Sequence, residues 1–355
     1  MPQQPNNILI IRLSSLGDVL MAIPAVRAIR NNFPDAHIAW LVEGSVGEFL
    51  ACQDFIDEVM HFPRGPIMRG LKKGNLRKAQ KETGRFLRQL RKDEYDLIID
   101  FHGIAKSACF SMIAGGKKKI GFGKMFAKEK SHLFYHSTVN GPDKRIHKVE
   151  RNMIIAEHLA CAGGIPVTPL KTSDDAIGYI DTFLEEAGNP SPLFAVNPFS
   201  SKGTDFKRWP LERYAELIGR IKQELQGYTI ILWGPGEKKE AERLKEMAPD
   251  GAILACPTDI PQMFALLQKI TIYIGGDTGV MHLAAAARTP VVAIFGPTDA
   301  KINAPYGAAH TVIRKDVSCS PCKKRDCTDR QCLTRTTVEE VYETVRNVYK
   351  RSTTH

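Results

Sequence analysis

The stretch "LIIRLSSLGDVLMAIPAVRAI", residues 9–29, decides the fold prediction. It begins with an apolar run that is typical of a strand buried in a parallel sheet, and it continues with apolar residues at helical spacing. A polar turn that contains Gly17 joins the two elements. Asp18 falls in the first turn of the predicted helix, where the helix dipole favours a carboxylate. Asp18 is therefore either a helix-start residue or a functional carboxylate at the edge of a sheet.

Strand and helix patterns alternate along both halves of the chain, which predicts two doubly wound α/β domains with parallel sheets. The predicted strands cover 7–13, 37–43 and 95–101 in the first half, and 193–199, 228–234, 251–256, 271–277 and 290–296 in the second. A helix over 147–164 with a glycine stop precedes a linker rich in proline and polar residues at 165–175. We expect domains at 1–170 and 171–335, facing each other across a ligand-binding cleft, and a C-terminal helix and tail at 336–355 that could pack on either domain.

Length and composition predict a globular protein of the cytoplasm. The 355 residues exceed one ordinary core, and no apolar run approaches the roughly 20 residues that a membrane-spanning helix needs. The N-terminal sequence "MPQQPNN" lacks the basic and apolar regions of a signal peptide.

The net charge of +10 belongs almost entirely to the first half of the chain. Residues 1–170 carry 25 Lys and Arg against 16 Asp and Glu, whereas residues 171–355 carry 24 against 23. The excess concentrates at 64–92 and 117–130. Such runs are typical of a solvated helix face, and also of sites for an anionic membrane, a phosphorylated ligand or nucleic acid. Nucleic acid is disfavoured because Phe86 is almost the only aromatic residue of the first run.

Four of the eight cysteines cluster in "CSPCKKRDCTDRQC", at Cys319, Cys322, Cys327 and Cys332. A structural zinc site usually has a longer separation between its ligand pairs. A zinc site, a disulfide pair and reduced thiols in a tight loop all remain open, although cytoplasmic cysteines are expected to be mostly reduced.

The segment "IGGDTGVMHLAAAA", residues 274–287, predicts a phosphate site. It follows an apolar strand, and Asp277, Thr278 and Gly279 open a helix whose first N–H groups have no partner within the helix. His282 shares the helix face of Thr278, so it either reaches the same ligand or is a satisfied core residue. The turn after the first strand lacks the G-x-G-x-x-G fingerprint, which disfavours a dehydrogenase.

Two further loops follow strands of the second half. "NPFSSKGTDFKRWP", residues 197–210, offers the hydroxyls of Ser200 and Ser201 and the cation of Lys207, and such a loop suits a diphosphate unless it is only solvated. In "LWGPGEKKEAERL", residues 232–244, Glu237 or Glu240 could accept hydrogen bonds from a ribose or could simply begin a helix.

Together and in this order, "IRLSSLGDVLMAIPAVRAI", "NPFSSKGTDFKRWP", "GGDTGVMHLAAAARTPVVAIFGPT" and the cysteine cluster resemble the lipopolysaccharide heptosyltransferases of glycosyltransferase family 9. The resemblance spans residues 7 to about 348. It implies a GT-B architecture with an acceptor-binding domain followed by a donor-binding domain. It also implies transfer of heptose from ADP-L-glycero-D-manno-heptose to Kdo-lipid A with inversion, without a metal or another cofactor. "DFHGIAKSA", residues 100–108, is similar to the segment of members that add the first heptose, with His102 in place of the usual glutamine.

Inverting transfer needs a base for the acceptor hydroxyl and fixed donors for the charge that grows on the departing diphosphate. We assign Asp18 as the base and Lys207 as the principal cation. The other predicted donor-binding residues are Ser200, Ser201, Glu237, Asp277, Thr278, Gly279 and His282, with Asp277 on sugar hydroxyls because a carboxylate would repel phosphate. The predicted acceptor-binding residues are Ser15, Gly17, Lys72, Lys73, His102 and Lys106.

The resemblance also gives the basic first half a partner, namely acidic groups of the acceptor and of the inner-membrane surface. We expect a peripheral protein on the cytoplasmic face of that membrane. A member that adds a later heptose or uses another nucleotide sugar remains an alternative. A non-catalytic membrane-surface binding protein is disfavoured because both Asp18 and Lys207 are present.

Overall fold

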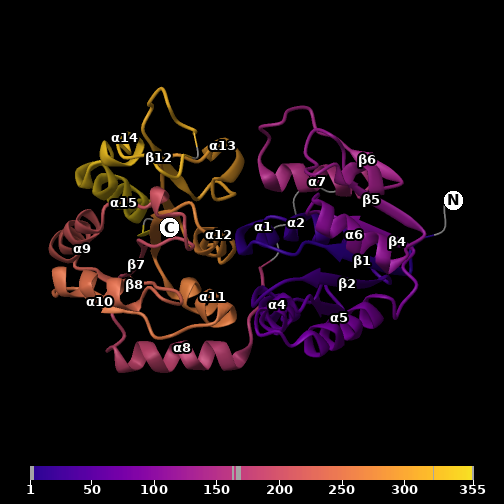
Figure 1. Ribbon diagram of the computed structural model, residues 1–355. Coiled ribbons are helices and arrows are strands. Elements are labelled where there is room, and N and C mark those ends of the chain that lie inside the picture. Colours follow the sequence, from indigo (N-terminus) through magenta and orange to yellow (C-terminus); the bar gives the residue numbers. More distant parts are fainter. Residues whose placement is uncertain (1–3, 162–163, 165–168, 323, 354–355) are drawn as a thin grey trace. The chain divides into compact units, whose positions relative to one another are not determined.

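Two six-stranded parallel sheets form the framework of the protein (Figure 1). The structure is a computed structural model, and it describes residues 4–161, 164, 169–322 and 324–353. The chain divides into two units, Met1–Lys171 and Thr172–His355. All eight predicted strands are present. The prediction of two doubly wound α/β domains is thus confirmed.

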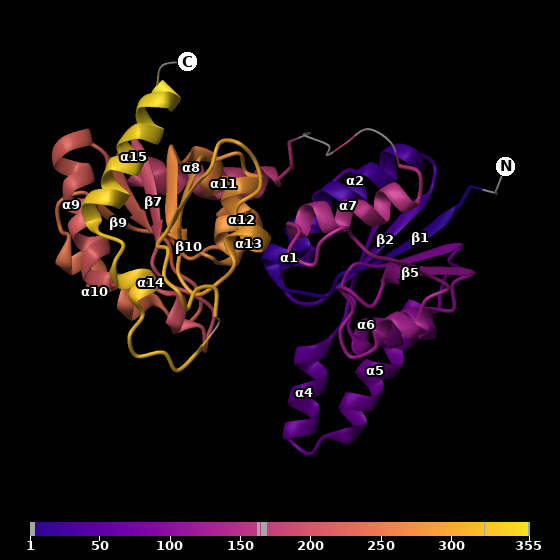
Figure 2. The same ribbon diagram turned by 90° about the horizontal axis from the view of Figure 1, so that it is seen from above.

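Unit 1 has the strand order β3-β2-β1-β4-β5-β6. Its strands are β1 (Asn7–Ile11), β2 (His37–Val42), β3 (Glu58–His61), β4 (Leu97–Asp100), β5 (Lys118–Phe122) and β6 (Ser137–Val139). Its helices are α1 (Leu16–Leu20), α2 (Ile23–Asn32), α3 (Val46–Ala51), α4 (Arg64–Lys72), α5 (Leu76–Leu90), α6 (Ala105–Ala114), the 3-10 helix η1 (Ser131–Phe134) and α7 (Lys148–His158). Figure 2 shows α2 and α7 on one face of this sheet and α5 and α6 on the other. The central strands are mostly apolar because both of their faces are covered.

Unit 2 repeats the same topology, with the strand order β12-β11-β10-β7-β8-β9. Its strands are β7 (Leu193–Asn197), β8 (Tyr228–Ile231), β9 (Ala252–Leu254), β10 (Ile272–Gly276), β11 (Val291–Phe295) and β12 (Thr311–Arg314). Its helices are α8 (Asp174–Glu186), the 3-10 helix η2 (Asp205–Lys207), α9 (Leu211–Leu225), α10 (Lys238–Met247), α11 (Ile260–Lys269), α12 (Gly279–Ala286), α13 (Ala300–Asn303), α14 (Gln331–Thr334) and α15 (Val338–Thr353).

The C-terminal helix α15 packs on unit 2. Val341, Tyr342 and Val345 are buried in the same apolar core as Phe194 of β7. The Trp209 indole also donates a hydrogen bond to the Thr336 carbonyl, at 2.9 Å, just before α15 begins. Both the apolar face and the connection before the helix therefore fix α15 to the sheet of unit 2.

Two local expectations were wrong. Gly17 does not lie in a turn before the helix, because α1 already begins at Leu16. The helix that ends unit 1 stops at His158, before the glycine pair, and the left-handed residue after it is Ala160, with φ 58°. The amide of Cys161 then reaches the Ala156 carbonyl, which satisfies the helix end without glycine. Much of the predicted linker, 165–168, lies outside the described residues.

Helices α4 and α5 form a hairpin that extends away from the sheet of unit 1 (Figure 2). This hairpin holds the basic run 64–92, which is thus helical with a short turn. Among the described residues, no helix is both long enough and apolar enough to cross a bilayer.

Candidate functional site

In both units most of the predicted site residues follow the two central strands of the sheet, whereas Lys72 and Lys73 come after β3 and Glu237 comes after β8. The strand order reverses between β1 and β4 in unit 1, and between β7 and β10 in unit 2. At such a switch point the loops after the two strands diverge to opposite faces and leave a crevice, which is where ligands bind in open α/β sheets. Each unit therefore has its own half-site.

In unit 1, Asp18 is held by two cations. Its Oδ2 lies 2.9 Å from the Arg12 guanidinium and its Oδ1 accepts from the Lys148 ammonium at 2.7 Å. The Ser15 hydroxyl donates to Oδ2 at 3.2 Å, as the N-cap of α1. Burial alone would raise the pKa of Asp18, but the charges of Arg12 and Lys148 and these hydrogen bonds outweigh it and hold that pKa far below its usual range. The carboxylate is therefore permanently ionised at physiological pH.

The cations around Asp18 come from opposite ends of the unit. Arg12 directly follows β1 and is buried, and its guanidinium also donates to the Phe101 carbonyl after β4, at 2.6 Å. Lys148 is the first residue of α7. Burial lowers the pKa of Lys148, although the Asp18 charge partly offsets this, and burial together with the Arg12 charge lowers the pKa of Arg151 to about 10. Two cations thus pair with one carboxylate and a third, Arg151, lies within its electrostatic influence, which leaves an excess of positive charge for an anionic ligand.

His102 adds a neutral hydrogen-bond donor to this half-site. The Leu13 amide donates to its Nδ1 at 3.3 Å, so the ring proton lies on Nε2. Burial and the Arg12 charge lower the pKa of His102 to about 3, so the ring is neutral at physiological pH. A neutral imidazole with Nε2–H can donate one hydrogen bond, as the usual glutamine amide would.

The turn that carries His102 is built on Asp100, a fully buried carboxylate. Its Oδ1 accepts from the amides of His102 and Gly103, at 2.7 and 3.1 Å, and its Oδ2 accepts from the Tyr135 hydroxyl at 2.6 Å. Burial raises the pKa of Asp100, and the hydrogen bonds oppose this rise. The sequence offered one signal for this role, namely a carboxylate at the end of an apolar strand.

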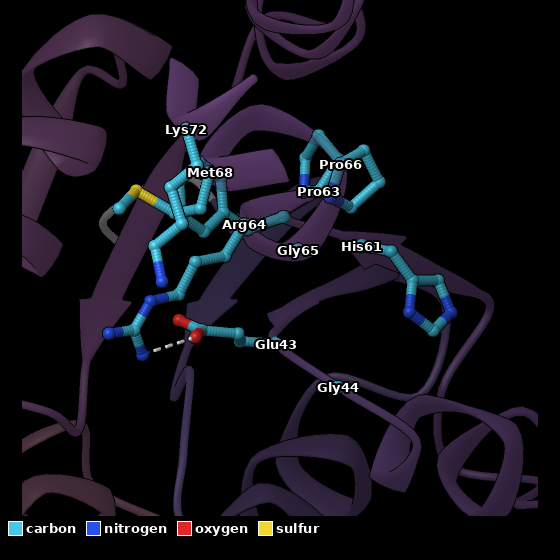
Figure 3. Close-up of a pocket in the computed structure, with 10 residues that line it drawn as sticks. Glu43, Gly44, His61, Pro63, Arg64, Gly65, Pro66, Met68 and Lys72 are labelled. Atoms are coloured by element: carbon cyan, nitrogen blue, oxygen red, sulfur yellow. Dashed lines mark hydrogen bonds and ion pairs between the residues drawn. The ribbon is translucent and has the colours of Figure 1, made fainter. Parts of the chain in front are cut away.

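A cavity of about 650 Å³ lies between the end of β2 and the start of α4. Its carboxylate, Glu43, pairs with Arg64 at 2.9 Å and with Lys106 at 2.8 Å. Burial raises the pKa of Glu43, but the hydrogen bonds and charges of Lys106 and Arg64 outweigh burial and lower it. Figure 3 shows that Arg64, Met68 and Lys72 extend to the same side of this cavity.

The predicted acceptor-binding lysines are therefore not all in one place. Lys106 and Lys72 are grouped around Glu43, whereas Lys73 lines a separate depression between α4 and α5 with Arg69 and Lys78. Ser15 and Gly17 lie beside Asp18 on α1.

In unit 2, Thr278 marks the switch point. It is the N-cap of α12 and accepts from the Met281 amide at 3.4 Å. The Asn197 amide group at the end of β7 donates to the Thr278 hydroxyl at 3.4 Å, and the Tyr273 hydroxyl lies 3.5 Å from it. Gly275 allows this close approach, because a Cβ there would lie 2.6 Å from the Tyr273 hydroxyl. Thr278 and Gly279 thus open α12 with their N–H groups at the crevice.

Lys207 and Asp277 form an ion pair, with Lys207 Nζ 3.0 Å from Asp277 Oδ2. Lys207 ends η2 and Asp277 follows β10, so the contact joins the loops after the two central strands. Their side chains are 22% and 12% exposed, which leaves part of each accessible from the crevice. The pairing explains why a carboxylate is tolerated beside a predicted phosphate site.

Arg208 organises the loop that carries the serines. Its guanidinium donates to the Ser200 hydroxyl and to the Ser200 carbonyl, at 3.1 and 2.9 Å. It also pairs with Asp205 at 2.9 Å and with Glu240 at 3.2 Å. Ser200 is buried and its hydroxyl donates to the Thr204 carbonyl, whereas Ser201 is exposed. In this structure Ser200 therefore shapes the loop, and Arg208 is a residue whose role the sequence did not reveal.

Glu237 and His282 lie on the elements that flank this loop. Glu237 is the N-cap of α10, accepts from the Gly234 amide at 2.8 Å and lies 3.7 Å from Arg208. Burial raises its pKa. His282 is nearly buried on α12, one turn after Thr278.

The four clustered cysteines form no disulfide. Among the described residues, no group of three or more His, Cys, Asp or Glu side chains could hold a metal ion. Burial raises the pKa of the Cys332 thiol, which favours its neutral form.

Comparison with known proteins finds relatives over most of the chain. Residues 83–333 match the family described as glycosyltransferase family 9 (heptosyltransferase). Lipopolysaccharide heptosyltransferase 1 of Pseudomonas aeruginosa is 27% identical over 328 residues, which cover 90% of this chain and 87% of the relative. The crystal structure of a family 9 glycosyl transferase from Veillonella parvula superimposes with a TM-score of 0.85 at 18% identity, over 99% of both chains. The E. coli heptosyltransferase WaaC with ADP gives 0.77 at 24% identity, over 96% of this chain and 99% of that one.

The two doubly wound units, each with polar residues at its switch point, have the GT-B fold, and the family match makes the protein a glycosyltransferase. The chain belongs to glycosyltransferase family 9, the heptosyltransferases. The family resemblance and the enzyme class inferred from the sequence are thus confirmed.

Proposed function

We propose that this enzyme transfers a heptose from ADP-heptose to Kdo-lipid A in lipopolysaccharide core biosynthesis, with inversion at the anomeric carbon and without a metal ion. The observation that carries the proposal is the division of chemistry between two half-sites. Unit 1 holds an ionised carboxylate among cations, and unit 2 holds a lysine beside a helix N-terminus. The names of its relatives, which include lipopolysaccharide heptosyltransferase 1, support the substrate class.

In the proposed reaction Asp18 accepts the proton of the attacking hydroxyl. Both of its oxygens already have partners, but each carboxylate oxygen has two lone pairs, so Oδ1 retains one beside Lys148. The low pKa of Asp18 makes it a weak base. Weak basicity suffices if the proton moves late, after the new C–O bond has made the hydroxyl strongly acidic.

On the donor side, the bond from the anomeric carbon to the diphosphate breaks and ADP leaves with the electron pair. Lys207 and the N–H groups that open α12 meet the growing charge, and one such donor is worth about 3 to 4 kcal/mol in the transition state. Asp277 keeps Lys207 in place and accepts hydrogen bonds from sugar hydroxyls. Glu237, at the start of α10, is suited to the ribose.

The acceptor is anionic, and the surplus of cations around Asp18 and Glu43 provides charge complementarity for it. His102 donates its Nε2–H to the acceptor, while Lys72 and Lys106 bind its acidic groups. We place the enzyme on the cytoplasmic face of the inner membrane, where this acceptor would be reached.

The test is to incubate the purified chain with ADP-heptose and Kdo-lipid A, with and without a chelator, and to weigh the product. We expect a mass gain of one heptose that the chelator leaves unchanged, and NMR should show an inverted anomeric configuration. Product formed only with an acceptor that already carries heptose would select the alternative of a later transfer. No product with either acceptor would refute the proposal.

A further inference from the structure

The tip of the α4–α5 hairpin, residues 68–78, exposes apolar side chains among cations. Every residue from 71 to 78 is exposed. Met68, Leu71 and Leu76 are 44%, 46% and 60% exposed, and they belong to the few large apolar side chains of the described residues that face water. Isolated exposed leucines are ordinary, but three large apolar groups on one short protrusion call for a partner.

The tip is a rigid turn. A Cβ on Gly70 would lie 3.2 Å from Ala79 Cβ, so the absence of a side chain lets the two helices approach closely. The Asn75 amide donates to the Gly70 carbonyl at 2.8 Å, and the Asn75 side chain caps α5 by accepting from the Lys78 amide at 3.0 Å. Gly74 takes a left-handed conformation, with φ 68°. The turn therefore presents Leu71 and Leu76 in fixed positions, so little conformational entropy is lost when it docks.

Cations surround these apolar groups without internal compensation. The basic side chains of the tip and of the first turns of α5 are Arg69, Lys72, Lys73, Arg77, Lys78 and Lys81. Among the described residues, not one of these six has a carboxylate within 4.0 Å, although Glu82 lies nearby on α5. Their charge is therefore available to an external anion.

An apolar tip surrounded by cations suits an acidic bilayer better than a second copy of the chain or a single-stranded nucleic acid. A second copy of the chain would bring the same cations into contact and repel. Single-stranded nucleic acid needs exposed aromatic platforms, and the one aromatic residue of α5, Phe86, is buried at 3% exposure. A bilayer with acidic headgroups offers both phosphates and an apolar interior.

We propose that the α4–α5 hairpin docks the enzyme on an anionic bilayer, with Leu71 and Leu76 inserted below the headgroups and the surrounding cations bound to lipid phosphates. The inference deepens the proposed function, since it names the element that carries the enzyme to a membrane-anchored acceptor. It adds an apolar contribution that charge alone does not supply.

Two kinds of variant separate the electrostatic and the apolar contributions to membrane binding. Each cation near an acidic surface is worth about 1 kcal/mol, or about fivefold in the partition coefficient. Arg77→Gln with Lys81→Gln should therefore weaken binding to vesicles of phosphatidylglycerol and phosphatidylcholine about 25-fold at low salt. The matched control, Lys239→Gln with Lys245→Gln on the exposed face of α10, loses the same charge and should change binding less than twofold.

Leu71→Ser with Leu76→Ser should weaken the same binding about tenfold and leave its salt dependence unchanged, because the charges remain. Met247→Ser, at an exposed methionine of unit 2, is the control and should bind as wild type. Both leucines are exposed, so the variant should fold, and thermal melting checks this. Equal binding of the leucine variant and the wild type would overturn insertion.

A fluorescent reporter gives a second readout. In a Leu76→Trp variant, acidic vesicles should shift tryptophan emission to the blue and brominated lipid should quench it, beyond the response of the native tryptophans. An unchanged spectrum would overturn the proposal. Turnover of a short-chain, water-dispersed acceptor by the Leu71→Ser, Leu76→Ser variant should match wild type. If the wild type also shows no turnover of this water-dispersed acceptor, the result refutes the proposed function and not the membrane contact.

Discussion

At Asp18, a single carboxylate connects the first loop of the chain with the last helix of unit 1. Arg12 and Lys148 both pair with it, so its removal leaves two cations without their partner. Asp18→Asn keeps the shape of the side chain but loses the charge and the capacity to take a proton. We expect kcat to fall by about 10² to 10⁴-fold, the usual worth of a general base, in a steady-state assay with both substrates.

The control is Asp54→Asn, because Asp54 also pairs with a lysine, Lys171, at 2.7 Å, but far more of its side chain is exposed. This variant should keep its rate. Near-normal turnover by Asp18→Asn would refute its role as the base, provided that its melting curve shows a folded protein.

His102 gives a pH prediction. Its folded pKa of about 3 lies below its unfolded value of about 6.5, so the folded state binds fewer protons. Such a group stabilises the fold above pH 6.5, and this stability is lost as the pH falls toward 3. Between pH 7.5 and 5, the wild type should therefore lose more unfolding free energy than His102→Gln, by at most about 2 kcal/mol, as measured by denaturant titration. His61→Gln, at an exposed histidine of the same unit, should follow wild type; parallel curves for His102→Gln and wild type would contradict the assignment.

At the scale of elements, Arg208 joins η2, the serine loop and α10. Because its guanidinium holds Ser200, Asp205 and Glu240 together, Arg208→Gln should loosen the loop and raise KM for ADP-heptose about tenfold, with a smaller change in kcat. Arg208→Lys should restore little, because an ammonium lacks the planar fork of donors. Arg243→Gln is the control, since Arg243 makes one long, exposed contact with Glu212 at 4.0 Å. A fall in kcat with unchanged KM would contradict this positioning role.

The elements that could be predicted are those with a strong periodic signal. The central strands β1, β4, β7 and β10 are continuous apolar runs, because both faces of each are covered. The strands β3, β6 and β12 lie at sheet edges, are only three or four residues long and carry polar side chains, so their pattern is weak. Strand β5 begins with two lysines, so its sequence is typical of a basic run and not of a buried strand.

The positions of the site residues were predictable in part for the same reason. Asp18, Asp277 and Thr278 follow apolar strands. In a parallel sheet, residues that follow the strands lie at the carboxyl edge of that sheet, so each of these residues lies at the carboxyl edge of the sheet of its own unit. Their partners were not predictable. Lys148 is 130 residues away from Asp18, and Lys207 is 70 away from Asp277, so only the fold reveals which charges meet.

At the scale of the whole molecule, the two units should divide binding from proton transfer. Calorimetric titration with ADP should give Asp18→Asn the affinity of wild type, because Asp18 belongs to unit 1 and the proposed donor-binding residues belong to unit 2. Lys207→Met should lower kcat by about 10² to 10³-fold and weaken ADP binding by much less, because Lys207 acts on charge that develops in the transition state. Lys222→Met, on α9 away from the crevice, should change neither quantity. A large loss of ADP affinity in Asp18→Asn would contradict this division.

The salt bridge between Lys148 and Asp18 also has a consequence during synthesis. A ribosome that has released the first 147 residues has produced every strand of the first sheet, and Arg12, but not the helix that supplies the second cation to Asp18. Asn152, on the same helix, donates a hydrogen bond to the Met21 carbonyl at 2.8 Å. This second contact with the beginning of the chain also forms only after the helix has been synthesised. The nascent amino-terminal half thus completes the contacts of Asp18 only when its last helix emerges and docks.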